Sequence, residues 1–185
     1  MPIWPRFCAD PAFGTMTEAQ ARQRASAMAG ARGDAAIDLY RQLRPNDPPT
    51  YWVTSLVTDK GTWIDSIRLA ERKRAQGAAA VYMYRLDWRT PVLGGAMRSP
   101  HGLDVPLVFD TVAAKPLMLG AGPQPQRVAD AMSTAWIRFA RSGNPSQPGL
   151  AWPAYDMTSR ETMIFDVESR AVADPDRALR LFWSS

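Results

Sequence analysis

The chain has 185 residues and a formal net charge of +4, and 46% of the residues are hydrophobic. This composition is typical of one folded globular domain with a substantial core, and it excludes a mainly disordered chain. No apolar run approaches the ~20 residues of a membrane helix. The N-terminus also lacks a basic segment followed by an apolar core. We therefore expect no membrane partner and no secretory signal.

Metal and cofactor sites are not expected from the residue types present. The only histidine is His101 and the only cysteine is Cys8. One residue of each kind argues against a zinc site, and a single cysteine cannot form an intrachain disulfide, so we interpret Cys8 as a free or buried thiol. No cofactor-binding motif is present either, and we expect no cofactor.

Positive charges are scattered, with one group at Arg68, Arg72, Lys73 and Arg74. A surface that binds nucleic acid usually adds aromatic stacking residues or a recognisable binding motif, and neither accompanies this group. The group is best explained as the solvated face of a helix, and we expect no nucleic-acid partner.

The first part of the chain favours helices. Thr17 and Gln20 have the spacing of a capping box, which predicts a helix that Gly30 and Gly33 interrupt. Asp34 is the expected cap of the next helix. The expected helices cover residues 18–28 and 35–43, and two more begin at Thr50 and Gly61, the last of them stopping at Gly77.

The second part alternates strands with helices. Residues 80–86 are β-branched, aromatic and apolar on both faces, which indicates a strand in a sheet that is covered on both sides. Beyond the loop 87–100, the expected elements are a helix over 125–142, a strand over 162–165 and a last helix with Asp174 as its cap and Pro175 at its first position. The order of elements predicts an α/β protein, and no linker divides residues 1–185.

The loop after the expected strand ends in the most informative motif. His101, Gly102, Asp104, Pro106 and Phe109 form the pattern His-Gly-x-Asp/Glu-x-Pro-x-x-Phe. This pattern resembles the histidine motif of the type-B carboxylesterases, the family of the cholinesterases and the bacterial p-nitrobenzyl esterases. In α/β-hydrolases the catalytic residues follow the chain order serine, acid, histidine, and the histidine lies on a late loop.

Other segments resemble the same family. Residues 135–145, followed by residues 152–155, are similar to its C-terminal signature, and residues 81–84 and 58–59 are weaker matches. The resemblance covers residues 4–165. It implies the C-terminal part of an α/β-hydrolase fold, with helices and the last strands of the sheet, so that residues 1–185 form a single C-terminal segment of that domain. We interpret the aromatic residues of these segments as core.

The resemblance implies a catalytic role for His101. In ester hydrolysis an imidazole takes the proton of a serine hydroxyl and later delivers it to the leaving alcohol. The family takes its triad acid from an earlier strand, so Asp104 is expected to be a second-shell carboxylate that supports the loop. The alternative that Asp104 itself orients the imidazole remains open.

The chain departs from the family at the other catalytic positions. No G-x-S-x-G nucleophile elbow and no HGGG oxyanion segment occur in it. The resemblance places Ile3 where the acidic residue is expected, and Asp10 and Glu18, the nearest carboxylates, have no motif support. The expected partner is therefore the N-terminal part of the same esterase, and this chain alone is expected to be inactive.

Three hypotheses follow. The first is the C-terminal part of a serine carboxylesterase whose complete form hydrolyses small carboxylic esters. The alternative is a non-catalytic binding or adhesion-type protein on the same fold, and a third is an independent small domain with its own ligand. Leu93, Met97 and Phe109 are candidates for an acyl or alcohol pocket, although core or loop packing is the better explanation of these residues.

Overall fold

The computed structural model describes residues 10–184. Cys8, Ile3 and the start of the family resemblance lie outside these residues. The chain divides into two compact units. Within the described residues, unit 1 comprises 10–69 and 176–184, and unit 2 comprises 70–175.

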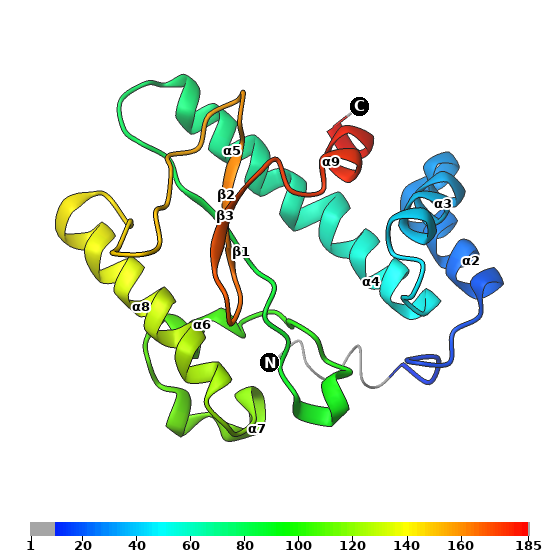
Figure 1. Ribbon diagram of the computed structural model, residues 1–185. Coiled ribbons are helices and arrows are strands. Elements are labelled where there is room, and N and C mark those ends of the chain that lie inside the picture. The colour runs from blue at the N-terminus through cyan, green and yellow to red at the C-terminus, as the bar shows by residue number, and fades with distance from the viewer. Residues whose placement is uncertain (1–9, 185) are drawn as a thin grey trace. The chain divides into compact units, whose positions relative to one another are not determined.

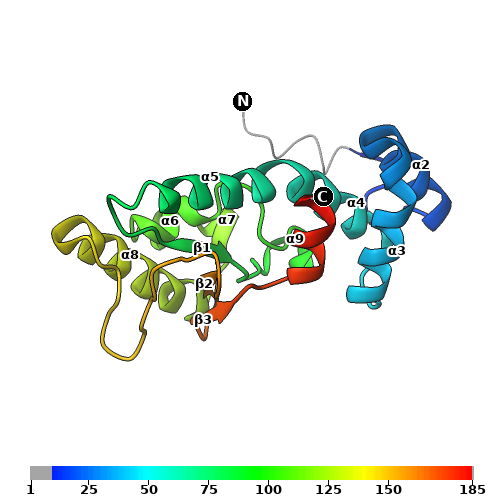
Figure 2. The same ribbon diagram turned by 90° about the horizontal axis from the view of Figure 1, so that it is seen from above.

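Unit 1 is helical (Figure 1). Its elements are α2 (Glu18–Ala29), the 3₁₀ turn η1 (Gly30–Arg32), α3 (Gly33–Leu43), α4 (Pro49–Thr58), the π-helical turn η2 (Asp59–Trp63), the beginning of α5 (Ile64–Ala75) and α9 (Arg177–Ser184). Helices α2, α3 and α4 lie side by side in both ribbon views (Figures 1 and 2).

The start of α2 is the predicted capping box. The amide of Gln20 donates to Thr17 Oγ1 at 3.3 Å, and the amide of Thr17 donates to Gln20 Oε1 at 2.9 Å. The next helix begins differently from the prediction, because α3 starts at Gly33 and no side chain caps it. Asp34 lies inside the first turn, where its negative charge interacts favourably with the helix dipole. Gly33 is required by packing, since a Cβ atom there would lie 2.4 Å from the amide nitrogen of Ser26.

The predicted helix break at Gly61 is wrong. Helices α4 and α5 are joined without a loop by the π-helical turn η2, which contains Gly61. A single π turn is a known insertion in α-helices and accommodates an extra residue without ending the helix. The turn carries Asp59, a nearly buried carboxylate, into the interior of unit 1.

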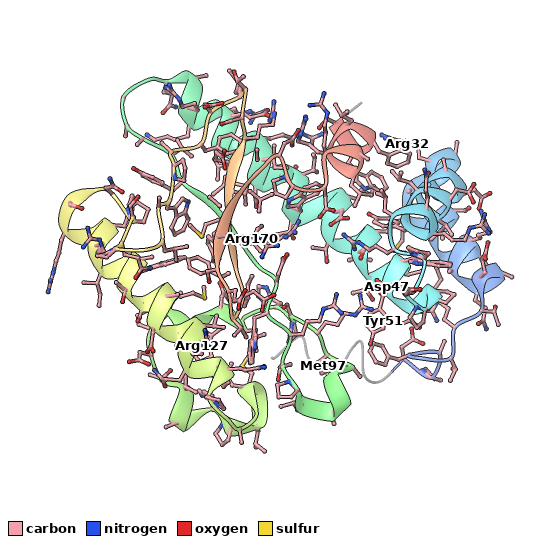
Figure 3. All side chains as sticks on the ribbon, viewed as in Figure 1. Arg32, Asp47, Tyr51, Met97, Arg127 and Arg170 are labelled. Carbon is pink, nitrogen blue, oxygen red and sulfur yellow. The ribbon has the colours of Figure 1, made fainter. Side chains whose placement is uncertain are left out.

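A series of buried hydrogen bonds connects α9 to the rest of unit 1. Tyr40 is fully buried, and its hydroxyl donates to Asp59 Oδ2 at 2.8 Å. The indole N–H of Trp183 donates to Tyr40 OH at 3.1 Å. Burial raises the pKa of Tyr40 well above its ordinary value, so the phenol stays neutral in the folded unit. Beside these hydrogen bonds, the guanidinium of Arg32 lies over the ring of Phe182 at 4.5 Å (Figure 3).

Unit 2 holds the sheet. Its elements are the end of α5, β1 (Met83–Leu86), the 3₁₀ turn η3 (Val92–Gly95), α6 (Asp104–Val108), the 3₁₀ turn η4 (Val112–Ala114), α7 (Pro116–Leu119), α8 (Gln124–Ser142), β2 (Glu161–Phe165) and β3 (Arg170–Ala173). The strand order is β1-β2-β3, with β2 parallel to β1 and antiparallel to β3.

The central strand is β2, and β1 lies at an edge of the sheet. Four consecutive residues of β2 are buried, as expected for a strand covered on both faces. The prediction for residues 80–86 is only partly correct, because β1 is limited to Met83–Leu86 and all four of its residues are half-buried. Within the described residues, no strand pairs with the second edge of β1. The sequence did not indicate β3, whose two ends are exposed.

Helix α8 matches its prediction and packs on the sheet (Figures 1 and 2). It ends at Gly143, which has the left-handed φ of +72° that favours glycine at this position. Its buried residues Val128, Met132 and Ala135 share one core with Met163 and Phe165 of β2. The order of helices and strands thus forms a mixed α/β unit, as predicted.

The predicted start of the last helix is wrong. Asp174 and Asp176 both have positive φ, at 44° and 56°, so the chain turns twice around Pro175 before α9 begins at Arg177. The first helical hydrogen bond runs from the amide of Arg180 to the carbonyl of Asp176. The dipeptide Asp-Pro here marks a turn that precedes the helix.

Replacing Tyr40 with Phe should destabilise unit 1. The change removes the donor to the buried Asp59 carboxylate and the acceptor for Trp183, and loss of a buried hydrogen bond to a charged group costs about 1.5–3 kcal/mol. The free energy of unfolding is to be measured by urea denaturation followed through tryptophan fluorescence. Tyr82→Phe is the matched control, because no hydrogen bond of that hydroxyl is found among residues 10–184. Equal midpoints for the two variants would contradict the prediction.

Candidate active site

His101 lies at the tip of a tight turn between η3 and α6. The turn is closed by a hydrogen bond from the amide of Leu103 to the carbonyl of Pro100, at 3.0 Å. Gly102 has a φ of +80°, a conformation that side chains rarely adopt. Leu103 is fully buried, whereas His101 is exposed. The turn therefore anchors the backbone in the core and presents the imidazole at the surface.

The imidazole has no protein partner within the described residues. No hydrogen bond or ion pair joins His101 to any of residues 10–184. The other carboxylates considered from the sequence are engaged elsewhere, since Asp10 pairs with Arg24 and Glu18 pairs with Arg22 at 2.7 Å. The hydrogen bond from Arg24 lowers the pKa of Asp10 to about 2. In residues 10–184, no carboxylate thus holds the ring of His101.

Asp104 contacts a tyrosine rather than the histidine. Tyr84 of β1 donates its hydroxyl hydrogen to Asp104 Oδ2 at 2.8 Å. Burial, together with the nearby Asp104 charge, raises the pKa of Tyr84 above its ordinary value, so the phenol keeps the proton that it donates. The ring of Tyr84 packs edge-on against Trp136, with centroids 4.9 Å apart. Sequence reasoning missed Tyr84 as a residue of this site.

The two arms of the loop that leads to His101 are tied to the body of unit 2. At its start, the amides of Asp87 and Trp88 both donate to the carbonyl of Phe165 at the end of β2, at 2.8 and 3.1 Å. Ser99 Oγ donates to the carbonyl of Trp88, which joins the start of the loop to its end. Trp88 itself is buried, and its indole N–H has no hydrogen-bond partner within residues 10–184.

Thr90 is the buried polar centre of the same loop. Its side chain is fully buried, and its hydroxyl donates to the carbonyl of Met118 at 2.7 Å and accepts from the amide of Val92 at 3.2 Å. Its amide donates to the carbonyl of Arg98 at 3.0 Å. Thr90 thus links both arms of the loop to α7. These hydrogen bonds fix the path of the backbone up to His101.

Large apolar side chains are exposed near this loop. Leu93 is 67% exposed and Phe109 is 72% exposed, so neither is packed in the core of this chain. Val105 and Leu117 are also exposed, at 53% and 90%. Met97, labelled in Figure 3, is half-buried and follows η3 in the chain. Exposed apolar side chains gathered in one segment are a common feature of interaction surfaces.

Neither a metal cluster nor a membrane helix is found in the described part of the chain. Across residues 10–184, no three side chains of the histidine, cysteine, aspartate and glutamate types gather as metal ligands. Over the same residues, every helix is too short or too polar to span a bilayer.

Comparison with protein families and curated proteins gives one consistent result. The family model described as "Carboxylesterase family" matches residues 19–181. The para-nitrobenzyl esterase of Bacillus subtilis (strain 168) is 32% identical over 127 residues, which cover 68% of this chain and 25% of that protein. The phenmedipham hydrolase of Pseudarthrobacter oxydans is 26% identical over 148 residues, covering 76% of this chain and 29% of that protein.

Solved structures agree. The carboxylesterase EST55 of Geobacillus stearothermophilus aligns with 95% of this chain at 29% identity, with a TM-score of 0.79. A structure of a PNB esterase aligns with 91% of the chain at 27% identity, with a TM-score of 0.65. This chain covers only 37% and 33% of those two chains, so it spans about a third of the solved structures that it matches.

Replacing Thr90 with Val should loosen the loop before His101. The change keeps the shape but leaves the carbonyl of Met118 and the amide of Val92 without the hydroxyl, at a cost of about 1–3 kcal/mol. Hydrogen exchange followed by mass spectrometry should show faster exchange in residues 88–100 and little change in α8. Thr134→Val is the control, since no hydrogen bond of its hydroxyl is found among residues 10–184. Unchanged exchange in the loop would refute the assigned role of Thr90.

Proposed function

This chain belongs to the carboxylesterase family, and we propose that it is the C-terminal part of a serine carboxylesterase, with His101 as the catalytic base. The observation that carries the proposal is the exposed His101 imidazole on a turn whose flanking residues are anchored in the core. The imidazole has no hydrogen-bond partner within residues 10–184, and hydrogen bonds fix the backbone that carries it. This arrangement leaves the ring nitrogens accessible for proton exchange with another group. A histidine that merely supported the fold would be expected to pack or to hydrogen-bond.

The proposed chemistry is acyl transfer. His101 removes the proton of a serine hydroxyl as that oxygen attacks the ester carbonyl carbon. It then gives this proton to the departing alcohol, leaving an acyl-serine. In the second half of the reaction it takes a proton from the water that attacks the acyl carbon and returns that proton to the serine oxygen as the acid leaves. The proposed substrate class is a carboxylic ester, since the similar proteins include a para-nitrobenzyl esterase.

Asp104 is proposed to support the loop rather than to orient the imidazole. One of its carboxylate oxygens is already bound by Tyr84, and no hydrogen bond joins it to His101 within residues 10–184. We assign the orienting acid to the rest of the hydrolase domain. The same applies to the serine nucleophile and the oxyanion hole, because the 185 residues contain no G-x-S-x-G and no HGGG segment.

The partner that supplies these groups is proposed to be the N-terminal part of the same esterase, with residues 1–185 as one C-terminal segment of its domain. Two features support this assignment. Within residues 10–184 no strand pairs with the second edge of β1, an edge at which a further strand could pair. The exposed side chains of Val105, Phe109 and Leu117 offer an apolar surface beside α6 and α7. This chain covers only 37% and 33% of the matched structures, which leaves ample protein to cover that surface.

Replacing His101 with Ala should abolish esterase activity in a completed enzyme. The test is a chimera in which the N-terminal portion of the Bacillus subtilis para-nitrobenzyl esterase precedes this chain. With a short p-nitrophenyl ester, His101→Ala should lower kcat by at least about a thousandfold, because triad residues act as a unit. Arg89→Ala, an exposed change in the same loop, is the control and should leave kcat near that of the chimera.

The 185-residue chain alone should show neither turnover nor labelling by a fluorophosphonate. An active His101→Ala chimera, or stoichiometric serine labelling of the isolated chain, would contradict the proposed function. A specific protein partner bound by the inactive chain would instead favour an adhesion-type protein on this fold.

The isolated chain should associate through its uncovered surface. Because no strand among residues 10–184 pairs with the second edge of β1, and because Phe109 and Leu117 are exposed, we expect binding of a hydrophobic dye and elution as oligomers in size-exclusion chromatography. The double variant Phe109→Lys with Leu117→Lys should bind less dye and shift towards the monomer. Leu69→Lys, at a site 69% exposed in unit 1, is the matched control. A monomeric wild-type chain with a sharp cooperative melt and no dye binding would overturn this expectation.

A further inference from the structure

We infer that Tyr84 is a positioning residue for His101, acting through the carboxylate of Asp104. The inference rests on the proposed catalytic role of His101, and it adds to that role the device that holds the turn. Its basis is the 2.8 Å hydrogen bond from the Tyr84 hydroxyl to Asp104 Oδ2, between the sheet and the first residue of α6.

One end of this connection is held by the core. Tyr84 pairs in parallel register with Met163 of the buried strand β2. Its ring makes edge-on contacts with Trp136, Phe165 and Trp152, at centroid distances of 4.9, 6.0 and 6.4 Å. Aromatic pairs of this geometry are favourable beyond the area that they bury. The phenol hydroxyl is therefore a fixed point with little freedom to follow the loop.

The other end lies three residues beyond His101. Only Gly102 and Leu103 separate the histidine from Asp104, and the amide of Leu103 closes the turn onto the carbonyl of Pro100. Gly102, at a φ of +80° that favours glycine, has no side chain with which to brace the turn. Together with the buried side chain of Leu103, the hydrogen bond to Asp104 thus holds the backbone that carries the imidazole against the core.

The hydrogen bond from Tyr84 also determines where the carboxylate of Asp104 lies. Asp104 is half-buried, and a carboxylate freed from Tyr84 would seek another donor. The nearest cation that the reaction generates would be the imidazolium of His101, three residues away. A carboxylate that moved there would compete with the orienting acid for the ring. By occupying Oδ2, the phenol keeps Asp104 as an anchor and leaves the ring free for its proper partner.

Hydrogen exchange on the 185-residue chain tests the anchor without any enzymatic activity. Tyr84→Phe removes only the hydroxyl, and Tyr82→Phe is the matched control, because Tyr82 lies two residues earlier, packs on Phe139 and Trp152, and has no hydroxyl partner within residues 10–184. In Tyr84→Phe, amides of residues 101–108 should exchange about ten to a hundred times faster, as expected for loss of a hydrogen bond to a charged group. Those of α8 should not change.

Variants at Asp104 separate this connection from a general loss of stability. Asp104→Ala should match Tyr84→Phe, and combining the two should add little, because both remove the same bond. Asp104→Asn keeps an oxygen that accepts from the phenol, so its exchange should stay closer to that of the wild type. Equal exchange in Tyr84→Phe and Tyr82→Phe, additive effects in the double variant, or acceleration spread evenly over unit 2 would each overturn the inference.

Kinetics in the chimera distinguish this inference from the proposed function. Tyr84→Phe should lower kcat by up to about a hundredfold with little change in KM, since a misplaced catalytic group affects the reaction more than binding. If His101→Ala abolishes activity while Tyr84→Phe alters neither exchange nor kcat, the positioning role is wrong and the proposed function stands. If the turn loosens in Tyr84→Phe while His101→Ala retains activity, the proposed function is wrong and Tyr84 is only a structural anchor.

Discussion

The structure of unit 2 depends on aromatic packing between the sheet, α8 and the segment that follows α8. Trp152 and Phe165 meet edge-on with centroids 5.4 Å apart, and Tyr84 contacts Trp136 from the neighbouring strand. Each such pair contributes about 0.5–1.5 kcal/mol beyond burial alone. The cluster fixes the register of β1 on β2 and the placement of α8 on the sheet. The loop that carries His101 begins at these strands, so its position follows from the same packing.

Local signals in the sequence predicted the elements that local chemistry determines. The capping box at Thr17 and the left-handed glycine at Gly143 marked their helix ends correctly, because both signals act within a few residues of the chain. Gly61 gave a false signal, since a glycine tolerated in a π turn looks the same in the sequence as one that ends a helix. The start of α9 was misplaced for a related reason, as Asp174 and Pro175 form a turn with a positive φ that spacing alone does not reveal.

The candidate site was only partly predictable. His101 and Asp104 stand in a family motif, and a motif is visible in one sequence. Tyr84 lies 20 residues before Asp104, and nothing in the sequence connects the two. The hydroxyl of Thr90, which reaches Met118 across 28 residues, is equally invisible before the fold is known. The side chains that support a loop from distant parts of the sequence are positioned by tertiary packing. Their roles can be recognised only once the contacts in the fold are known.

The hydrogen bond between Trp183 and Tyr40 spans 143 residues of sequence. Unit 1 is therefore discontinuous along the chain, with all of unit 2 encoded between its two segments. During synthesis the ribosome delivers α2, α3 and α4 long before α9, and a contact of such separation must wait for the later segment. We expect the helices of unit 1 to emerge with Tyr40 and Arg32 still lacking their α9 neighbours. This order of synthesis makes the completion of unit 1 a late event, after the sheet of unit 2 has left the ribosome.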